Sequence, residues 1–209
     1  MNTASVDHAR VSEAIRAAEA KTSGEIYCVL AGKSDDYFHA AAFSLAIGLL
    51  LISAIAALAL EAWWISIRPI MLIVAGALAY AAALAVIWLW PALRIRLITK
   101  GLRYRRAHDN AVRQFLARNI HITRARTGVL IFVSMAERYA EIVADDGINR
   151  KVPQSAWNDI VARLLQDAAA GRLTEGYEGA IATVGELLSE HFPYRPDDSN
   201  ELDDHLVEI

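Results

Sequence analysis

Two apolar stretches decide how this chain is organised: AAAFSLAIGLLLISAIAALAL at residues 40–60 and PIMLIVAGALAYAAALAVIWLWPAL at residues 69–93. They contain 21 and 25 residues and no charged side chain. About 20 apolar residues in a helix cross the roughly 30 Å hydrocarbon layer of a membrane. With the short loop between them, they predict a transmembrane hairpin over residues 40–93. The alternative is a pair of helices buried in a soluble core.

Tryptophan residues stand at the ends of both stretches. Trp63 and Trp64 follow the first stretch, and Trp88 and Trp90 lie near the end of the second. Amphipathic tryptophan rings favour the headgroup region of a bilayer. Their positions favour the transmembrane interpretation over the buried one, and the lipid bilayer is therefore an expected partner.

Positive charge predicts the orientation of the hairpin. Six basic residues follow the second stretch, whereas the loop at residues 61–68 offers only Arg68. The six are Arg94, Arg96, Lys100, Arg103, Arg105 and Arg106. Because cytoplasmic flanks carry the excess of Lys and Arg, we expect a multi-pass protein of the plasma (inner) membrane with both termini cytoplasmic.

The same basic block has a second interpretation, which is nucleic-acid binding. The block directly follows a membrane exit and carries no recognisable nucleic-acid-binding motif. Contact with anionic lipid headgroups explains it more simply. We therefore expect no nucleic-acid partner.

The rest of the chain has the composition of a globular domain. Without residues 40–93, about 155 residues remain, which is enough for one core but hardly for two. The single cysteine, Cys28, excludes an internal disulfide and is interpreted as core packing in a strand. We divide this part into residues 1–36, residues 94–193 and an acidic tail at residues 194–209, whose apolar residues leave open whether it docks.

Hydrophobic periodicity and turn residues predict the elements of this domain. Four helices are expected, at residues 7–22, 105–119, 156–170 and from 174 to the proline at 193. Three strands are expected, at residues 25–30, 129–133 and 140–144. The last two are separated by a short turn, which predicts an antiparallel hairpin.

The first helix and strand bury too little to fold alone, and a two-stranded sheet is marginal. Pairing residues 25–30 with the later strands completes one core. An even number of membrane crossings leaves both halves on the same side, as this pairing requires. The predicted fold class is α/β, a small mixed sheet flanked by helices and interrupted by the transmembrane hairpin.

The ordered set of local sequences resembles the TPM-domain family. It comprises TSGEI at 22–26, TGVLIFVS at 127–134, Glu137-Arg138, EIVADDGI at 141–148, and Val152-Pro153 ahead of Trp157. The resemblance covers roughly residues 7–35 and 105–193, and the hairpin lies between these parts as an insertion. It implies an α/β sandwich around a small sheet, in a membrane-anchored bacterial member. Other members include a thylakoid lumen phosphatase and an auxiliary protein of acetylcholine receptors, so the resemblance implies the fold better than the activity.

Three acidic residues are candidate metal ligands: Asp145, Asp146 and Glu25. Asp145 and Asp146 end a predicted strand, where the family resemblance implies acidic residues. Adjacent carboxylates, with Glu25 and the amide of Asn149, suit a hard divalent cation such as calcium. The alternative is that Asp146-Gly147 is an ordinary turn pair. No catalytic or other cofactor-binding residue is assigned, because the sequence has no nucleophile elbow, glycine-rich phosphate loop or close histidine pair.

Two function classes follow. The first is a membrane-anchored interaction or auxiliary module whose partner is another membrane protein. The second is a divalent-metal-dependent phosphatase that uses the acids near Asp145. The absence of a catalytic constellation in the sequence favours the first.

Overall fold

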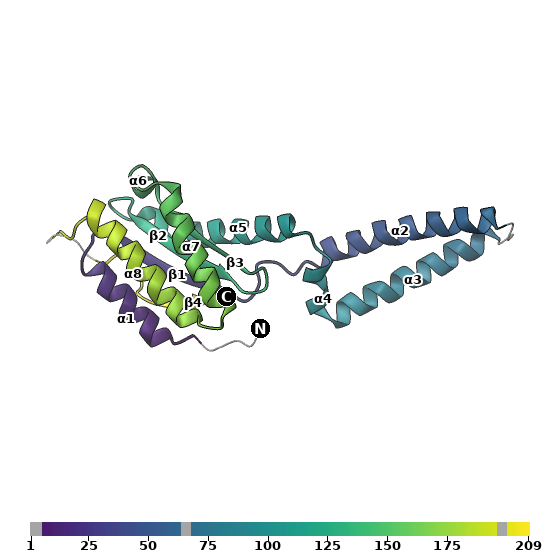
Figure 1. The fold of residues 1–209 in the computed structure, drawn as a ribbon, viewed down its shortest axis with the longest axis horizontal. Coiled ribbons are helices and arrows are strands. Elements are labelled where there is room, and N and C mark those ends of the chain that lie inside the picture. The colour runs from purple at the N-terminus through teal and green to yellow at the C-terminus, as the bar shows by residue number, and fades with distance from the viewer. Residues whose placement is uncertain (1–5, 64–67, 196–199) are drawn as a thin grey trace. The chain divides into compact units, whose positions relative to one another are not determined.

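The computed structural model describes residues 6–63, 68–195 and 200–209 (Figure 1). Trp64, the rest of the loop at residues 64–67 and residues 196–199 of the acidic tail lie outside these ranges. The chain divides into two compact units, each considered by itself. The α/β unit combines Met1–Ser34 with Arg105–Ile209, and the hairpin unit is Asp35–Tyr104.

A mixed four-stranded sheet forms the centre of the α/β unit. Its strands are β1 (Glu25–Ala31), β2 (Gly128–Ser134), β3 (Tyr139–Ala144) and β4 (Leu206–Glu208), in the order β3-β2-β1-β4. β1 pairs with β2 in parallel over seven residues, and β2 pairs with β3 antiparallel. The predicted α/β class and the pairing of the first strand with the later ones are confirmed.

Helices cover both faces of the sheet. Every residue of β1 and β2 is buried, because side chains on both faces meet helices. One face packs against α1 (His8–Glu19), α7 (Gln154–Ala169) and α8 (Leu173–His191). The other face packs against α5 (Lys100–Ala117), through Ala111 and Phe115 (Figure 1). The central sheet is therefore enclosed in a three-layer core.

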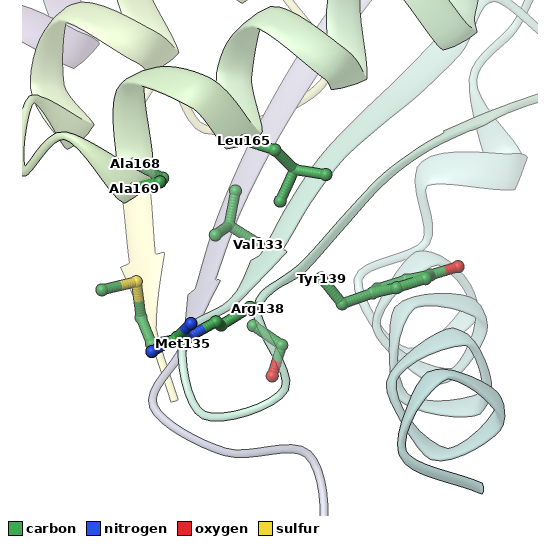
Figure 2. A pocket seen from close by; sticks show the side chains of 8 residues that line it. Val133, Met135, Arg138, Tyr139, Leu165, Ala168 and Ala169 are labelled. Carbon is green, nitrogen blue, oxygen red and sulfur yellow. The ribbon is translucent and has the colours of Figure 1, made fainter. Parts of the chain in front are cut away.

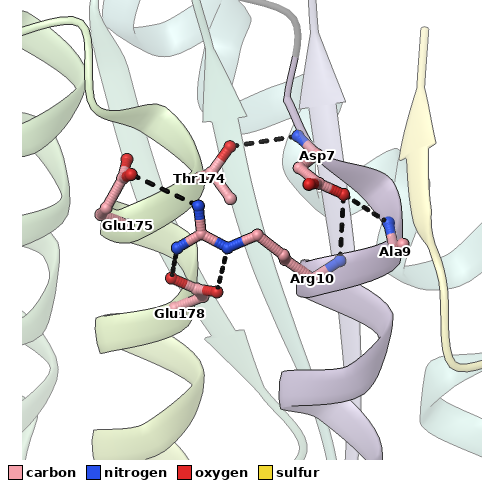
Figure 3. Close-up of polar contacts among 6 residues, drawn as sticks. All are labelled: Asp7, Ala9, Arg10, Thr174, Glu175 and Glu178. Carbon is pink, nitrogen blue, oxygen red and sulfur yellow. Dashed lines mark hydrogen bonds and ion pairs between the residues drawn. The ribbon is translucent and has the colours of Figure 1, made fainter.

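Polar contacts join α1 to α8 (Figure 3). Asp7 caps α1, because its carboxylate accepts the N–H of Arg10 at 3.2 Å. The backbone N–H of Asp7 also donates to the Thr174 hydroxyl of α8 at 3.1 Å. The guanidinium of Arg10 donates twice to the Glu178 carboxylate, at 2.9 and 2.6 Å, and lies 3.5 Å from Glu175. This bidentate ion pair joins the exposed sides of the two helices, whose apolar sides pack together in the core.

Two short helices complete the unit beside the sheet. η1 (Ile120–Ile122) precedes β2, and α6 (Asp146–Asn149) follows β3. A Cβ atom at Gly128, the first residue of β2, would lie 2.3 Å from the carbonyl oxygen of Ile120. Glycine is therefore needed where η1 crosses the start of β2.

The C-terminal residues dock on the sheet. Leu206–Glu208 forms β4, which pairs in parallel with β1. Leu206 is only 2% exposed and joins the core cluster on the side of α1 and α8. The sequence left open whether these apolar residues dock, and the structure shows that Leu206 and Val207 do.

The hairpin unit contains α2 (Phe38–Ala62), α3 (Pro69–Leu89) and α4 (Pro91–Arg96). α2 and α3 are long and apolar enough to cross a membrane, each with a mean hydropathy of 2.6. Their most apolar windows are 0% and 6% buried, which contradicts the alternative of two core helices. The second apolar stretch is not one helix: it breaks at Trp90, because the residue before a proline disfavours helical geometry and Pro91 begins α4.

Arg94 ties the two ends of the hairpin unit together. Its side chain is 9% exposed and donates to the carbonyl oxygens of Ile87 and Trp88 near the end of α3, at 2.8 and 3.2 Å. It also forms an ion pair of 2.7 Å with Asp36 and lies over the ring of Phe38. The guanidinium thereby satisfies carbonyl groups that a helix end leaves without partners.

Candidate functional site

The sheet brings two of the three predicted metal ligands to one edge. Glu25 is the register partner of Gly128 at the start of β2, and the N–H of Asp145 donates to the Gly128 carbonyl at 2.9 Å. Glu25 and Asp145 are 7% and 5% exposed. Two buried acidic residues thus flank one glycine, at the edge where β1 and β2 begin and β3 ends.

Asp145 has one carboxylate oxygen without a partner. Its Oδ1 atom caps α6 by accepting the N–H of Asp146 at 2.7 Å. Its Oδ2 atom is buried and accepts no hydrogen bond within the described part of the chain. The guanidinium of Arg126 lies 3.9 Å from Oδ1. A buried carboxyl oxygen without a hydrogen-bond partner is energetically costly, and a cation or a donated hydroxyl group would satisfy it.

The other predicted ligands are engaged elsewhere. The Glu25 carboxylate accepts the backbone N–H groups of Glu201 and Leu202, at 3.2 and 3.3 Å. Asp146 is exposed and pairs with Arg150, one helical turn away. The side-chain amide of Asn149 donates to the Ala144 carbonyl at 2.7 Å, closing the end of β3. The three acids share one end of the sheet but have separate partners.

Within residues 6–63, 68–195 and 200–209, no three His, Cys, Asp or Glu side chains are grouped so that they could hold a metal ion. A cation at Asp145 would need backbone carbonyl, hydroxyl or water oxygens to complete its shell. The unpartnered Oδ2 atom of Asp145 could then serve as the one carboxylate ligand of that cation. Metal binding by Asp145, Asp146 and Glu25 therefore remains a prediction.

The Asp-Gly pair is not a simple turn. Gly147 lies inside α6 and has no left-handed backbone conformation. A Cβ atom there would meet the carbonyl oxygen of Arg126 at 2.5 Å. Glycine is required because the loop before β2 passes close to α6, which the local sequence does not reveal.

A polar pocket of about 340 Å³ opens beside Glu25. It is lined by Ser23, Glu25, Thr123, Arg124, Ala125, Thr127, Arg195 and Glu201. The lining carries two guanidinium groups, two carboxyl groups and three hydroxyl groups, so its positive and negative side chains are equal in number. The hydroxyl groups of Thr123 and Thr127 are already hydrogen-bonded within the chain. Sequence reasoning missed Arg124 and Arg195, which are 71 positions apart and carry no motif.

A second pocket, of about 150 Å³, lies between the β2–β3 turn and the last turns of α7 (Figure 2). Its walls include the apolar side chains of Val133, Leu165 and Ala168. Arg138 enters it from the turn, where its backbone takes a left-handed conformation with a φ of 52°. The pocket is small and mostly apolar, with Ser134, Arg138 and Tyr139 as its polar lining residues.

Two titratable groups near β1 have raised pKa values: Glu19, which is half-buried, and Cys28, which is buried. Burial raises the pKa of Glu19 to about 9, and the nearby acids Glu25 and Asp204 raise it as well, although the hydrogen bond from Ile26 lowers it. Burial also raises the pKa of the Cys28 thiol, which is 0% exposed. A thiol that resists ionisation is a poor nucleophile, so Cys28 is a core residue.

The fold, together with the acidic end of the sheet near Glu25 and Asp145, defines a small α/β domain interrupted by an apolar hairpin. Residues 95–187 match the family model of the TPM domain, which supports membership of the TPM-domain family for this part of the chain. The fold is similar to that of the BA42 protein from the psychrophilic bacterium Bizionia argentinensis, solved by NMR. The TM-score is 0.60 at 19% sequence identity, over 100% of this chain and 99% of that one. No curated protein matches the chain in sequence.

Proposed function

We propose that this chain is an integral membrane protein whose TPM domain faces the cytoplasm and serves as an interaction or auxiliary module for another membrane protein. One observation carries the proposal: the apolar hairpin is inserted between β1 and α5 of a single α/β unit. β1 and β2 pair over seven residues, so both must lie on the same side of a membrane. Two crossings, and not one, satisfy that requirement.

Charge and exposure support the same arrangement. The large apolar side chains of α2 and α3 are mostly exposed, with Leu50 at 70% and Leu78 at 67%. Such a surface needs lipid or a partner helix to cover it. The basic residues of α4 and α5, against the single Arg68 of the loop, favour a cytoplasmic α/β unit.

Single-cysteine labelling tests the topology in intact cells. The buried Cys28 is first replaced in a Cys28→Ala background, and Glu61→Cys, Lys21→Cys and Lys100→Cys are then added one at a time. An impermeant maleimide should label Glu61→Cys on intact cells and the other two only after permeabilisation. Labelling of Lys21→Cys and Lys100→Cys from opposite sides would contradict the two-crossing arrangement.

Purification from the membrane tests the auxiliary role. The full chain, extracted with a mild detergent, should retain a membrane protein in stoichiometric amount. The control carries Arg96→Gln, Lys100→Gln and Arg106→Gln and is expressed at the same level. It should keep the partner protein if the partner binds the α/β unit or the spans and not the basic block. A wild-type chain that always purifies alone would count against the proposal.

The second candidate function is divalent-metal-dependent hydrolysis of phosphate esters. It is favoured by the buried, unpartnered Oδ2 atom of Asp145 and by Arg124 and Arg195 in the pocket beside Glu25. A bound cation would neutralise phosphate oxygens, and the two guanidinium groups would orient them. Asp145 is proposed to hold the cation, with backbone, hydroxyl or water oxygens completing its shell. Glu25 and Asp146, the other two predicted ligands, lie at the same end of the sheet and would have to leave their present partners to join it.

Titration with calcium, magnesium and manganese tests this candidate. The cation should raise the melting temperature of the full chain, and Asp145→Asn should abolish the shift, whereas Asp159→Asn on the exposed face of α7 should not. Turnover of p-nitrophenyl phosphate that is lost in Asp146→Asn would favour hydrolysis over the auxiliary role. The absence of any ion-dependent stabilisation would eliminate the metal site.

A further inference from the structure

The edge of β1 opposite β2 is covered by a very short strand. Seven residues of β1 pair with β2, but only three pair with β4. The ladder continues through Ile209, whose N–H donates to Leu30 at 2.9 Å and whose carbonyl accepts from Gly32 at 2.8 Å. Figure 1 shows β4 at the border of the sheet. A sheet edge of this kind presents N–H and C=O groups to any strand that reaches it.

The groove beside β1, which β4 occupies, binds side chains on both faces of the sheet. Leu206 enters the core formed with α1 and α8, and Val207 packs against the opposite cluster, which contains Phe115 of α5. Adjacent strand residues point to opposite faces, so the two apolar residues fill two different depressions. This is the recognition pattern of strand addition, in which the backbone gives affinity and alternate side chains give specificity.

Polar groups of the unit hold the residues before and within β4. The C-terminal segment, residues 200–209, is held at its start by the Glu25 carboxylate, which accepts the N–H of Leu202. Arg16 donates to Asp204 at 3.2 Å, and His8 lies 3.0 Å from Glu208. The Arg16 and His8 side chains are 70% and 51% exposed. Such exposed pairs contribute little, so one buried leucine and a short ladder hold most of the segment.

We propose that the edge of β1 is a strand-docking groove, that the chain's own C-terminal segment is its resident ligand, and that the same segment of a second copy can replace it. A second copy carries a strand already complementary to every part of the groove. Exchange of an identical terminal element between copies creates no new contact and loses none. The proposal does not depend on the membrane role above, because the groove lies wholly in the α/β unit.

A cross-link tests the exchange directly. Cys28 is the only cysteine of the chain, and it is the register partner of Leu206. In Leu206→Cys, copper phenanthroline added as oxidant forms a disulfide between β4 and β1, within one chain or between two. The buried Cys28 thiol becomes accessible to it only when β4 leaves β1, which is the event that exchange requires. After incubation of the full chain in detergent at high concentration, non-reducing electrophoresis should show a disulfide-linked dimer, absent in the Cys28→Ala, Leu206→Cys control. Oxidised monomer alone would overturn exchange between copies.

A peptide tests the groove itself. A fluorescent peptide of sequence NELDDHLVEI should bind Leu206→Asp, whose own strand is weakened, at least about tenfold more tightly than wild type, because the resident segment competes intramolecularly. The same peptide with aspartate in place of its leucine at position 206 should not bind. Adding Glu25→Gln should weaken binding. A folded Leu206→Asp chain that does not bind the peptide would overturn the groove.

Discussion

The carboxyl group of Glu19 accepts a hydrogen bond of 2.7 Å from the backbone N–H of Ile26, at the point where α1 ends and β1 begins. Burial raises the pKa of this group to about 9, well above the 4.5 of a free glutamate, and the acids Glu25 and Asp204 add to the effect. The folded chain therefore keeps a proton on Glu19 at neutral pH, which the unfolded chain releases.

Stability should consequently fall as the pH rises. Between about pH 4.5 and pH 9 the folded state binds more protons at Glu19 than the unfolded state, so this contribution is complete below 4.5 and lost by about 9. The slope is at most about 1.4 kcal/mol per pH unit. Urea denaturation of the full chain at pH 6 to 10 should show the decline, and Glu19→Gln should flatten it. A parallel pH dependence in the two proteins would contradict the assignment.

Gly128→Ala should destabilise the α/β unit by about 2 kcal/mol or more, because the new methyl group would overlap the backbone of η1. The matched control is Gly179→Ala in α8, where no atom lies within 4 Å of the new Cβ. That change should stabilise the chain by about 0.5–1 kcal/mol, since alanine favours helix. Thermal denaturation followed by circular dichroism compares them, and equal melting temperatures would refute the close approach.

Glu137→Ala should cost about 3 kcal/mol, because it removes the acceptor of the buried Ser134 hydroxyl and of the half-buried Ser34 N–H. Glu137 is 2% exposed and accepts the N–H of Ser34 at 3.0 Å and the hydroxyl of Ser134. Glu186→Ala on the exposed face of α8 should stay within about 0.5 kcal/mol of wild type. Urea denaturation measures both. A loss no larger than that of the control would show that the buried carboxylate contributes nothing.

Arg94→Met should destabilise the base of the hairpin unit, where Arg94 joins the end of α3 to Asp36. It removes the donor to the carbonyl groups of Ile87 and Trp88 at the end of α3, at a cost of about 1–3 kcal/mol, and breaks the ion pair with Asp36. Amide exchange of residues 86–96 should become faster, whereas Arg96→Met, an exposed residue of the same basic block, should leave it unchanged. Unchanged exchange in Arg94→Met would mean that helix packing alone, without the Arg94 contacts, holds the base of the hairpin unit in place.

The sequence by itself determined the elements whose signals are local. Two long uncharged runs specified α2 and α3, and apolar residues at helical spacing specified α7 and α8. The run VLIFV at residues 129–133 specified a strand buried on both faces. Each of these signals is complete within about 25 residues, so no distant partner is needed to interpret it.

Only the tertiary structure decided the partners of the candidate site. Glu25 faces the backbone of Leu202, 177 positions away, and the two arginines of the polar pocket come from segments with no shared motif. The docking of Leu206 likewise depends on β1 having a free edge. These contacts follow from strand register and from the path of loops, which are set by the packing of the whole core and leave no periodic trace in the local sequence.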